Sequence, residues 1–149
     1  MEDFTQQFEL DCAPLRAYQG LTEEIPQWWS ELFEGRATSL GDRFTVRFGE
    51  SIFKTMEVAG LKTGQRVAWK VVDSIIDIPE LDRKTEWIGT SILWDIRALR
   101  NKTGLTLTHK GLNPEVECYD ICRVGWGNFT HSLIDHLLWE KGRPFKTAV

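Results

Sequence analysis

The segment between Asn113 and Gly142 most strongly constrains how this chain can fold, because it carries the pattern of one long helix. Asn113 is a typical helix cap, Pro114 suits the first helical position, and Gly142 is a typical helix end. A helix of about 28 residues would be roughly 40 Å long. Its apolar residues recur at spacings of three and four, which predicts one packed face: Tyr119, Cys122, Trp126, Phe129, Leu133 and Leu137.

Two glycines, Gly125 and Gly127, lie within this helical pattern. Each costs about 1 kcal/mol relative to alanine inside a helix, so each needs a structural reason. We expect the backbone to approach a neighbour closely here, so that Trp126 packs tightly. A local kink is the alternative.

Between about residues 37 and 110 the apolar residues recur at every second position, which is typical of antiparallel strands with one buried face. In residues 43–48 the alternation is strict, with Phe44, Val46 and Phe48 on one face. Short turns join the successive segments, which favours a meandering sheet. The other strands are predicted at 8–12, 53–61, 67–72, 87–98 and 105–109.

Two short helices are predicted before the main run of strands. Pro14 suits the first turn of one helix, and Gly20 would end it. Thr22 would then cap a second helix. The apolar side of that helix would consist of Trp28, Trp29, Leu32 and Phe33.

The widths of these elements predict a curved sheet. Six or seven strands at about 4.8 Å spacing form a sheet nearly 30 Å wide, whereas a helix is only about 10–12 Å across. The sheet must therefore curl around the helix, and the short helices would close one end. We predict a single α+β domain over residues 1–149, with a curved antiparallel sheet around a long C-terminal helix. A small apolar molecule would bind between them.

The candidate ligand-binding residues are those expected to face this space. The chain has seven Trp and eight Phe, and large aromatic side chains each bury about 150–250 Å². These rings either line a cavity or fill it, and the sequence leaves both possibilities open. The candidates are Phe44, Val46, Phe48, Met56, Trp69, Trp94 and His109 from the sheet, with Trp126 and Phe129 from the helix.

His109 is the one candidate for acid–base chemistry in the predicted cavity, because it shares a strand face with Leu105 and Leu107. The alternative is a core histidine satisfied by a neighbouring polar group. His131 and His136 are five residues apart, so they do not form an i, i+4 metal pair, and we expect both at the surface. No catalytic residue, metal site or cofactor is predicted.

The three cysteines, Cys12, Cys118 and Cys122, favour reduced thiols packed in the core over a zinc site or a disulfide framework. The N-terminus is acidic and lacks the apolar stretch of a secretory signal, so we expect a cytoplasmic protein. No apolar run approaches the roughly 18–20 residues of a membrane span, so no membrane insertion is expected. The net charge of −4 argues against nucleic-acid binding.

Several short motifs, taken together in their order and spacing, resemble those of a known family. They are Trp28-Trp29, Gly-Asp-Arg-Phe at 41–44, the run from Thr103 to Leu112, Gly125-Trp126, and Lys-Gly-Arg-Pro at 141–144. From about residue 7 to 145 the chain resembles the Hsp90-ATPase-activator-homologue branch of the START/Bet v 1-like (SRPBCC) superfamily.

That resemblance implies a helix-grip fold with an internal hydrophobic cavity. It also implies relatives that bind lipids, polyketides or other apolar molecules, some of them cyclases, and a namesake that is a co-chaperone domain. The branch has no shared catalytic motif, so no catalytic residue is carried over. We expect binding of a small hydrophobic molecule. The alternatives are interaction with a chaperone or another protein, anchored by Trp29 and Trp139 if these are exposed, and a cyclase- or hydratase-type enzyme that uses His109.

Overall fold

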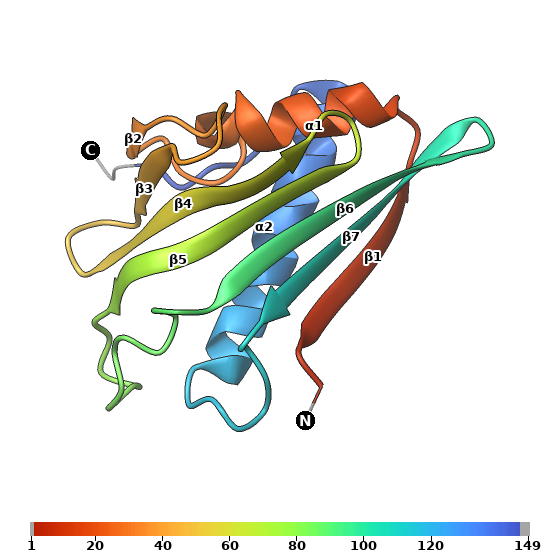
Figure 1. Ribbon diagram of the computed structural model, residues 1–149. Coiled ribbons are helices and arrows are strands. Elements are labelled where there is room, and N and C mark those ends of the chain that lie inside the picture. Colours follow the sequence, from red (N-terminus) through yellow and green to blue (C-terminus); the bar gives the residue numbers. More distant parts are fainter. Residues whose placement is uncertain (1, 147–149) are drawn as a thin grey trace.

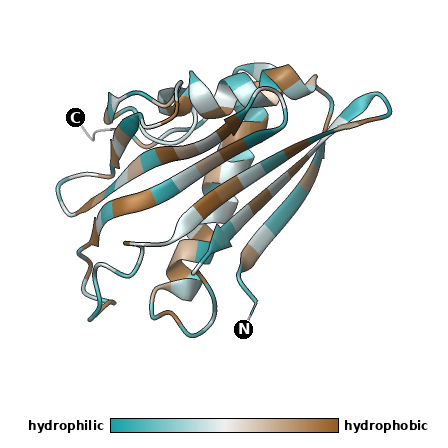
Figure 2. Cartoon of the chain, viewed as in Figure 1, coloured by the Kyte–Doolittle hydropathy of each residue, from teal (hydrophilic) through white to brown (hydrophobic). Residues whose placement is uncertain are grey.

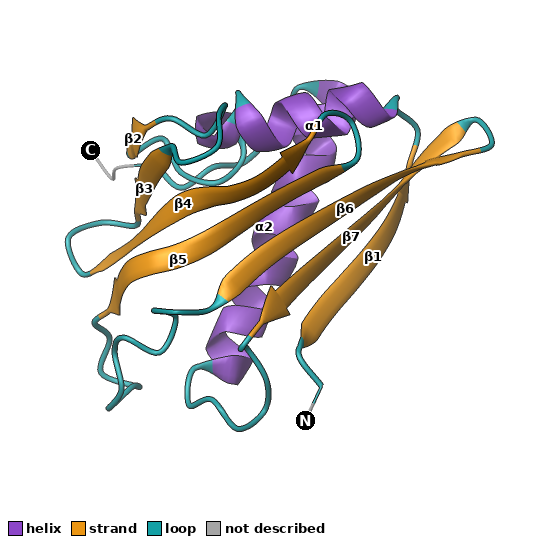
Figure 3. Cartoon of the chain, viewed as in Figure 1, coloured by secondary structure: helices purple, strands orange, loops and turns teal. Residues whose placement is uncertain are grey.

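Residues 2–146, which the computed structural model describes, form a seven-stranded antiparallel sheet wrapped around one long helix (Figure 1). The strand order is β1-β7-β6-β5-β4-β3-β2. The first strand, β1, therefore forms one edge of the sheet and pairs with the last strand, β7. Helix α2 crosses one face of the sheet, and α1 lies over one end (Figure 3). The predicted α+β helix-grip architecture is confirmed. The elements are β1 (Phe4–Leu10), α1 (Pro14–Thr22), the 3-10 helix η1 (Ile25–Gln27), β2 (Phe33–Gly35), β3 (Arg43–Arg47), β4 (Ile52–Lys62), β5 (Arg66–Ile76), β6 (Ser91–Leu99), β7 (Lys102–Lys110) and α2 (Tyr119–Trp139).

Alternation along the strands decides which face of the sheet is buried (Figure 2). In β3, Phe44 and Val46 are buried, and Phe44 is the register partner of buried Met56 in β4. On the other face, Thr45 and Thr55 form a cross-strand hydroxyl pair at 2.7 Å. The apolar face of the sheet therefore turns toward α2 and forms the core.

Polar contacts fix α1 and η1 against the C-terminal half of α2. The indole Nε1 of Trp28 donates to the carbonyl oxygen of Gly20 at 2.8 Å. Glu24 accepts from the Arg16 guanidinium at 2.6 Å and lies 2.8 Å from Nε2 of His136. The expected surface position of His136 is wrong, because this pairing holds its ring buried, whereas His131 is exposed.

Helix α2 begins at Tyr119 rather than at Pro114. The Asn113 side chain accepts from the amide of Glu115 at 3.0 Å, which closes a local turn instead of starting the helix. Further along, the carboxylate of Glu86 accepts from the amides of Glu117 and Cys118, each at 3.2 Å. A carboxylate about thirty residues away in sequence thus satisfies the amides just before the helix, and no local pattern encodes that.

The expected boundaries of the two short helices are wrong. Helix α1 continues through Gly20 to Thr22, whose hydroxyl donates to the carbonyl of Tyr18 at 2.9 Å. A Cβ at Gly20 would lie 2.6 Å from the Leu137 side chain, so this glycine allows α1 to pack closely on α2. The second helix is reduced to η1, and Phe33 belongs to the short edge strand β2.

Several predicted strand boundaries also differ; for example, β5 ends at Ile76 rather than at residue 72, and β7 begins at Lys102 rather than at residue 105. The first strand is β1 over Phe4–Leu10 rather than 8–12, and β6 begins at Ser91 rather than Trp87. Trp87 instead lies in the loop between β5 and β6, where it is buried. The apolar pattern marked burial there correctly, but the burial comes from a loop that folds back onto the core.

The glycine interpretations at α2 need correction. A Cβ at Gly125 or Gly127 would meet nothing within 4 Å, so close backbone approach does not explain them. At the other end, Glu140 adopts a left-handed conformation (φ 55°) and ends the helix before Gly142. A Cβ at Gly142 would lie 2.2 Å from the Gln27 carbonyl oxygen, so this glycine serves packing rather than helix termination.

Candidate functional site

One end of the interior holds a cavity of about 190 Å³ between the first half of α2 and the β4–β5 side of the sheet. Alternation along β4 brings the side chains of Ile52 and Lys54 to the concave face, and α2 supplies Trp126 and Phe129. A cavity of about 150 Å³ is known to accept benzene, so this space suits a body of one or two rings. The lining residues are Trp29, Phe48, Ile52, Lys54, Ile76, Ile78, Trp87, Ile121, Cys122, Gly125, Trp126 and Phe129.

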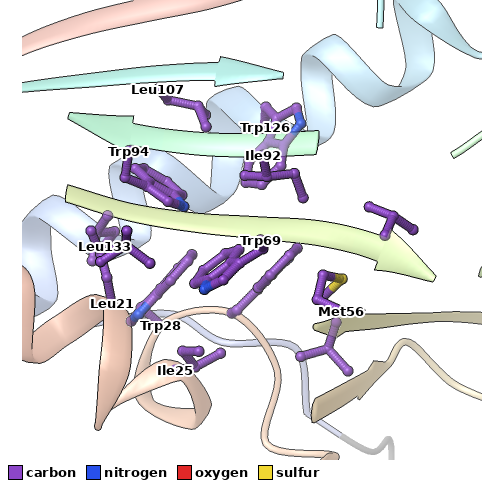
Figure 4. Packing of buried hydrophobic residues seen from close by; sticks show 14 of the residues in the cluster. Leu21, Ile25, Trp28, Met56, Trp69, Ile92, Trp94, Leu107, Trp126 and Leu133 are labelled. Carbon is purple, nitrogen blue, oxygen red and sulfur yellow. The ribbon is translucent and has the colours of Figure 1, made fainter. Parts of the chain in front are cut away.

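Packed tryptophan rings and aliphatic side chains fill the interior beside the cavity (Figure 4). Trp28 stacks on Trp29 with ring centroids 5.5 Å apart, and Trp29 stacks on Trp69 at 5.8 Å. Trp94 meets both Trp69 and Trp126 edge-on, each at 5.9 Å. Both possibilities raised by the sequence therefore hold in different places: most of the aromatic candidates pack in the core, and a few of them line a cavity at one end.

Three of the predicted ligand-binding residues, Phe48, Trp126 and Phe129, line the cavity. The others do not line it, although the structure buries all of them in the core. They are Phe44, Val46, Met56, Trp69, Trp94 and His109. Whether any of these side chains contacts a ligand stays a prediction.

Lys54 provides the positive charge in the cavity lining. Its Nζ lies 4.4 Å from the ring centroid of Trp87 and 4.7 Å from that of Phe48, an arrangement typical of cation–π contacts. Among the described residues, no side chain or carbonyl hydrogen-bonds this ammonium, and no carboxylate pairs with it. Burial among the lining side chains lowers the pKa of Lys54 to about 8, against an opposing effect of Cys122 and Cys118.

A pair of thiols lies beside this lysine. Trp87 donates from Nε1 to the Sγ of Cys122 at 3.2 Å. The pKa of the Cys122 thiol is lowered, chiefly by its hydrogen bond with Cys118 and also by the charge of Lys54, whereas that hydrogen bond and burial raise the pKa of Cys118. Cys12 is only partly buried and lies apart from the cavity.

His109 is a satisfied core residue with no surface in the cavity. The Trp126 indole donates from Nε1 to Nδ1 at 3.0 Å, so the proton of the neutral ring lies on Nε2. Nε2 lies 2.9 Å from the Thr90 hydroxyl oxygen, which itself donates to the carbonyl of Trp87 at 2.6 Å. Burial lowers the pKa of His109 to about 3, with a further contribution from Lys54. The geometry therefore supports the structural reading of His109 over the acid–base one.

Sequence reasoning missed Lys54, Trp87 and Cys122 as cavity residues. The signal for Lys54 was available, because counting back by two from inward-facing Met56 reaches Lys54 and then Ile52. For Trp87 no such signal exists, since its position depends on the path of a loop.

Within residues 2–146 no group of three His, Cys, Asp or Glu side chains is placed to hold a metal ion. No helix in that range is long and apolar enough to cross a membrane. The chemistry available in the cavity is thus apolar contact, aromatic stacking, one ammonium group and one thiol.

No family profile and no curated protein sequence matches this chain. Solved structures do share its fold. The Aha1 dimer from Colwellia psychrerythraea superposes with a TM-score of 0.76 at 23% identity, over 95% of this chain and 100% of that one. DynU16, a protein of the dynemicin biosynthetic locus, gives 0.68 at 15% identity, over 95% of this chain and 49% of its own length. CalU16 from Micromonospora echinospora gives 0.61 at 13%, over 87% and 74%.

At these identities the likeness establishes the fold. The sheet, the long C-terminal helix and their order along the chain recur over nearly the whole sequence, as the resemblance noted from the motifs implied. The chain has the helix-grip fold found in the Aha1 protein from Colwellia psychrerythraea.

Proposed function

We propose that this protein binds a small, largely apolar molecule with an aromatic or lipid-like body in the cavity between α2 and the β4–β5 side of the sheet. The observation that carries the proposal is the cavity of about 190 Å³ with a mainly apolar and aromatic lining. Concave sites of this composition, with few polar groups, are typical ligand sites. Its volume favours a body of one or two rings over a sterol or a long acyl chain.

Two glycines on α2 allow a matched test. Gly125 lines the cavity and Gly127 does not, and in both cases the space around an added Cβ is open. A leucine at 125 should fill part of the cavity, whereas a leucine at 127 should leave it intact. Both substitutions remove a helical glycine, so both variants should fold.

The test is a thermal-shift screen of small aromatic acids and alcohols, fatty acids, flavonoids and sterols, with tryptophan fluorescence as a second readout. We expect small aromatic compounds to raise the melting temperature of the wild type and of Gly127→Leu, but not of Gly125→Leu. The proposal fails if no compound stabilises the wild type, or if Gly125→Leu responds as strongly as the wild type.

A second candidate function is interaction with a protein partner, such as a chaperone, through Trp139. This side chain is 68% exposed at the end of α2, where it is available to a partner. Trp29, the other expected anchor, is only 2% exposed and is therefore unavailable. Titration with purified Hsp90 tests the idea: Trp139→Ala should weaken any binding at least tenfold, and unchanged affinity would exclude this anchor.

A further inference from the structure

Lys54 is the charged side chain of the cavity lining and bears on which polar group a ligand would carry. Its ammonium lies in a mostly apolar cavity, held against the faces of Trp87 and Phe48. Contacts with aromatic faces offset only part of the cost of removing an ammonium from water. Among residues 2–146 no carboxylate lies within ion-pair distance of it.

The alternation of side chains along β4 directs Lys54 to the concave face of the sheet. On β4 it takes its place in the inward series between Ile52 and Met56, where alternation calls for an apolar residue. Outward-facing positions on the neighbouring strand do carry a lysine: Lys70 of β5 is exposed. A lysine on the inward face instead directs one charge into the ligand space.

We propose that the ligand is a small aromatic monocarboxylate whose carboxylate group pairs with the Lys54 ammonium. This inference rests on the proposed function and adds the chemical class of the ligand. One cation matches one negative charge, whereas a phosphate group would call for several donors. The remaining lining, including Ile76 and Phe129, contacts the ring system. The Trp87 indole N–H already donates to Cys122 and is not free to bind the anion.

A pair of probes that differ in one group tests the proposal in the unmodified protein. trans-Cinnamate and cinnamyl alcohol have the same ring and chain, but only the first is an anion at pH 7. By isothermal titration we expect the wild type to bind cinnamate at least tenfold more tightly, as a charge-assisted hydrogen bond in a partly buried site provides.

Variants then assign the preference to one residue. Lys54→Met should bind the two probes equally, whereas Lys70→Met, which removes the same charge from the outer face, should keep the wild-type preference. Circular dichroism verifies that both variants are folded, and the two-probe comparison in the wild type needs no variant.

The outcomes separate this inference from the proposed function. If the wild type binds cinnamyl alcohol as tightly as cinnamate, the carboxylate assignment is wrong and the ligand-binding function stands. If Lys54→Met retains the preference, another group binds the anion and the assignment to Lys54 is wrong. If neither these probes nor any compound of the wider screen binds, both proposals are overturned.

Discussion

At the scale of single residues, two basic side chains on the concave face of the sheet, His109 and Lys54, have different roles. His109 has partners at both ring nitrogens and completes a polar link between β7 and α2. The Lys54 ammonium lies against the faces of Trp87 and Phe48, and no carboxylate of the described residues pairs with it. A group that the fold satisfies is part of the core, whereas a group that the fold leaves without a counter-ion is a candidate for binding.

Replacing Lys54 with methionine should stabilise the unliganded protein. The pKa of Lys54 falls from its ordinary value of 10.5 to about 8 on folding, so the folded state binds this proton less tightly than the unfolded chain does. The penalty for burying this charge is absent above pH 10.5, grows as pH falls from 10.5 to 8 and is complete below pH 8, so at pH 7 the charge is a net cost. Because Lys54 is half-buried, we expect a gain of roughly 1–2 kcal/mol by urea denaturation.

The control for that experiment is Lys70→Met, which should change the free energy of unfolding by no more than about 0.5 kcal/mol because it is a surface substitution. A clear loss of stability in Lys54→Met would mean that the ammonium supports the fold, and would contradict the functional interpretation of this residue.

The His109 ring should remain neutral well below neutral pH. Its pKa falls from 6.5 to about 3 on folding because of burial and the charge of Lys54. The unfolded chain therefore takes up the proton first, so the contribution of His109 to stability is complete above pH 6.5 and is lost as pH falls toward 3. Following the His109 ring signals by NMR between pH 7.5 and 4.5 should show no titration. A midpoint above pH 5 would contradict the buried hydrogen-bond network.

At the scale of elements, the different surroundings of Gly142 and Gly127 predict opposite effects of replacing each with alanine. Gly142→Ala should destabilise the protein by about 1–3 kcal/mol, because its Cβ would meet the backbone carbonyl of Gln27 at 2.2 Å. Gly127→Ala should stabilise it by about 0.5–1 kcal/mol, because it lies inside α2 with open space around it. Thermal denaturation of both variants checks this, and equal effects would contradict the docking of the segment after α2 on η1.

Elements with a regular side-chain period were predictable, and those that depend on distant partners were not. Alternation identified the inward face of β3 and β4, and the spacing of three and four identified the buried face of α2. The predicted start of α2 was wrong because Glu86, about thirty residues earlier in the sequence, accepts hydrogen bonds from the amides just before Tyr119. The end of α1 was wrong because Gly20 serves contact with Leu137.

The candidate site was predictable to a similar extent. The inward aromatic set was correctly placed in the interior, but which rings pack and which line a cavity depends on their relative orientation in space. Trp69 packs against both Trp29 and Trp94, which leaves no space for a ligand between these rings. Lys54 was within reach of the alternation rule, whereas Trp87 and Ile78 come from a loop whose path is set by tertiary packing.

At the scale of the whole molecule, the curved sheet and α2 are complementary along most of their length and separate at one end. At that end a cavity lies between them, with a mainly apolar lining and the ammonium of Lys54. The packed tryptophans therefore limit the size of any molecule that this cavity can hold. The proposed ligand would lie between the same two layers that form the core.

A crystal structure of the protein soaked or grown with trans-cinnamate tests this account most directly. The predicted result is electron density for the ring between Trp87, Phe129 and Ile76, with the carboxylate within hydrogen-bond distance of Nζ of Lys54. An empty cavity at a saturating concentration of the compound, or density only on the outer surface of the sheet, would contradict it.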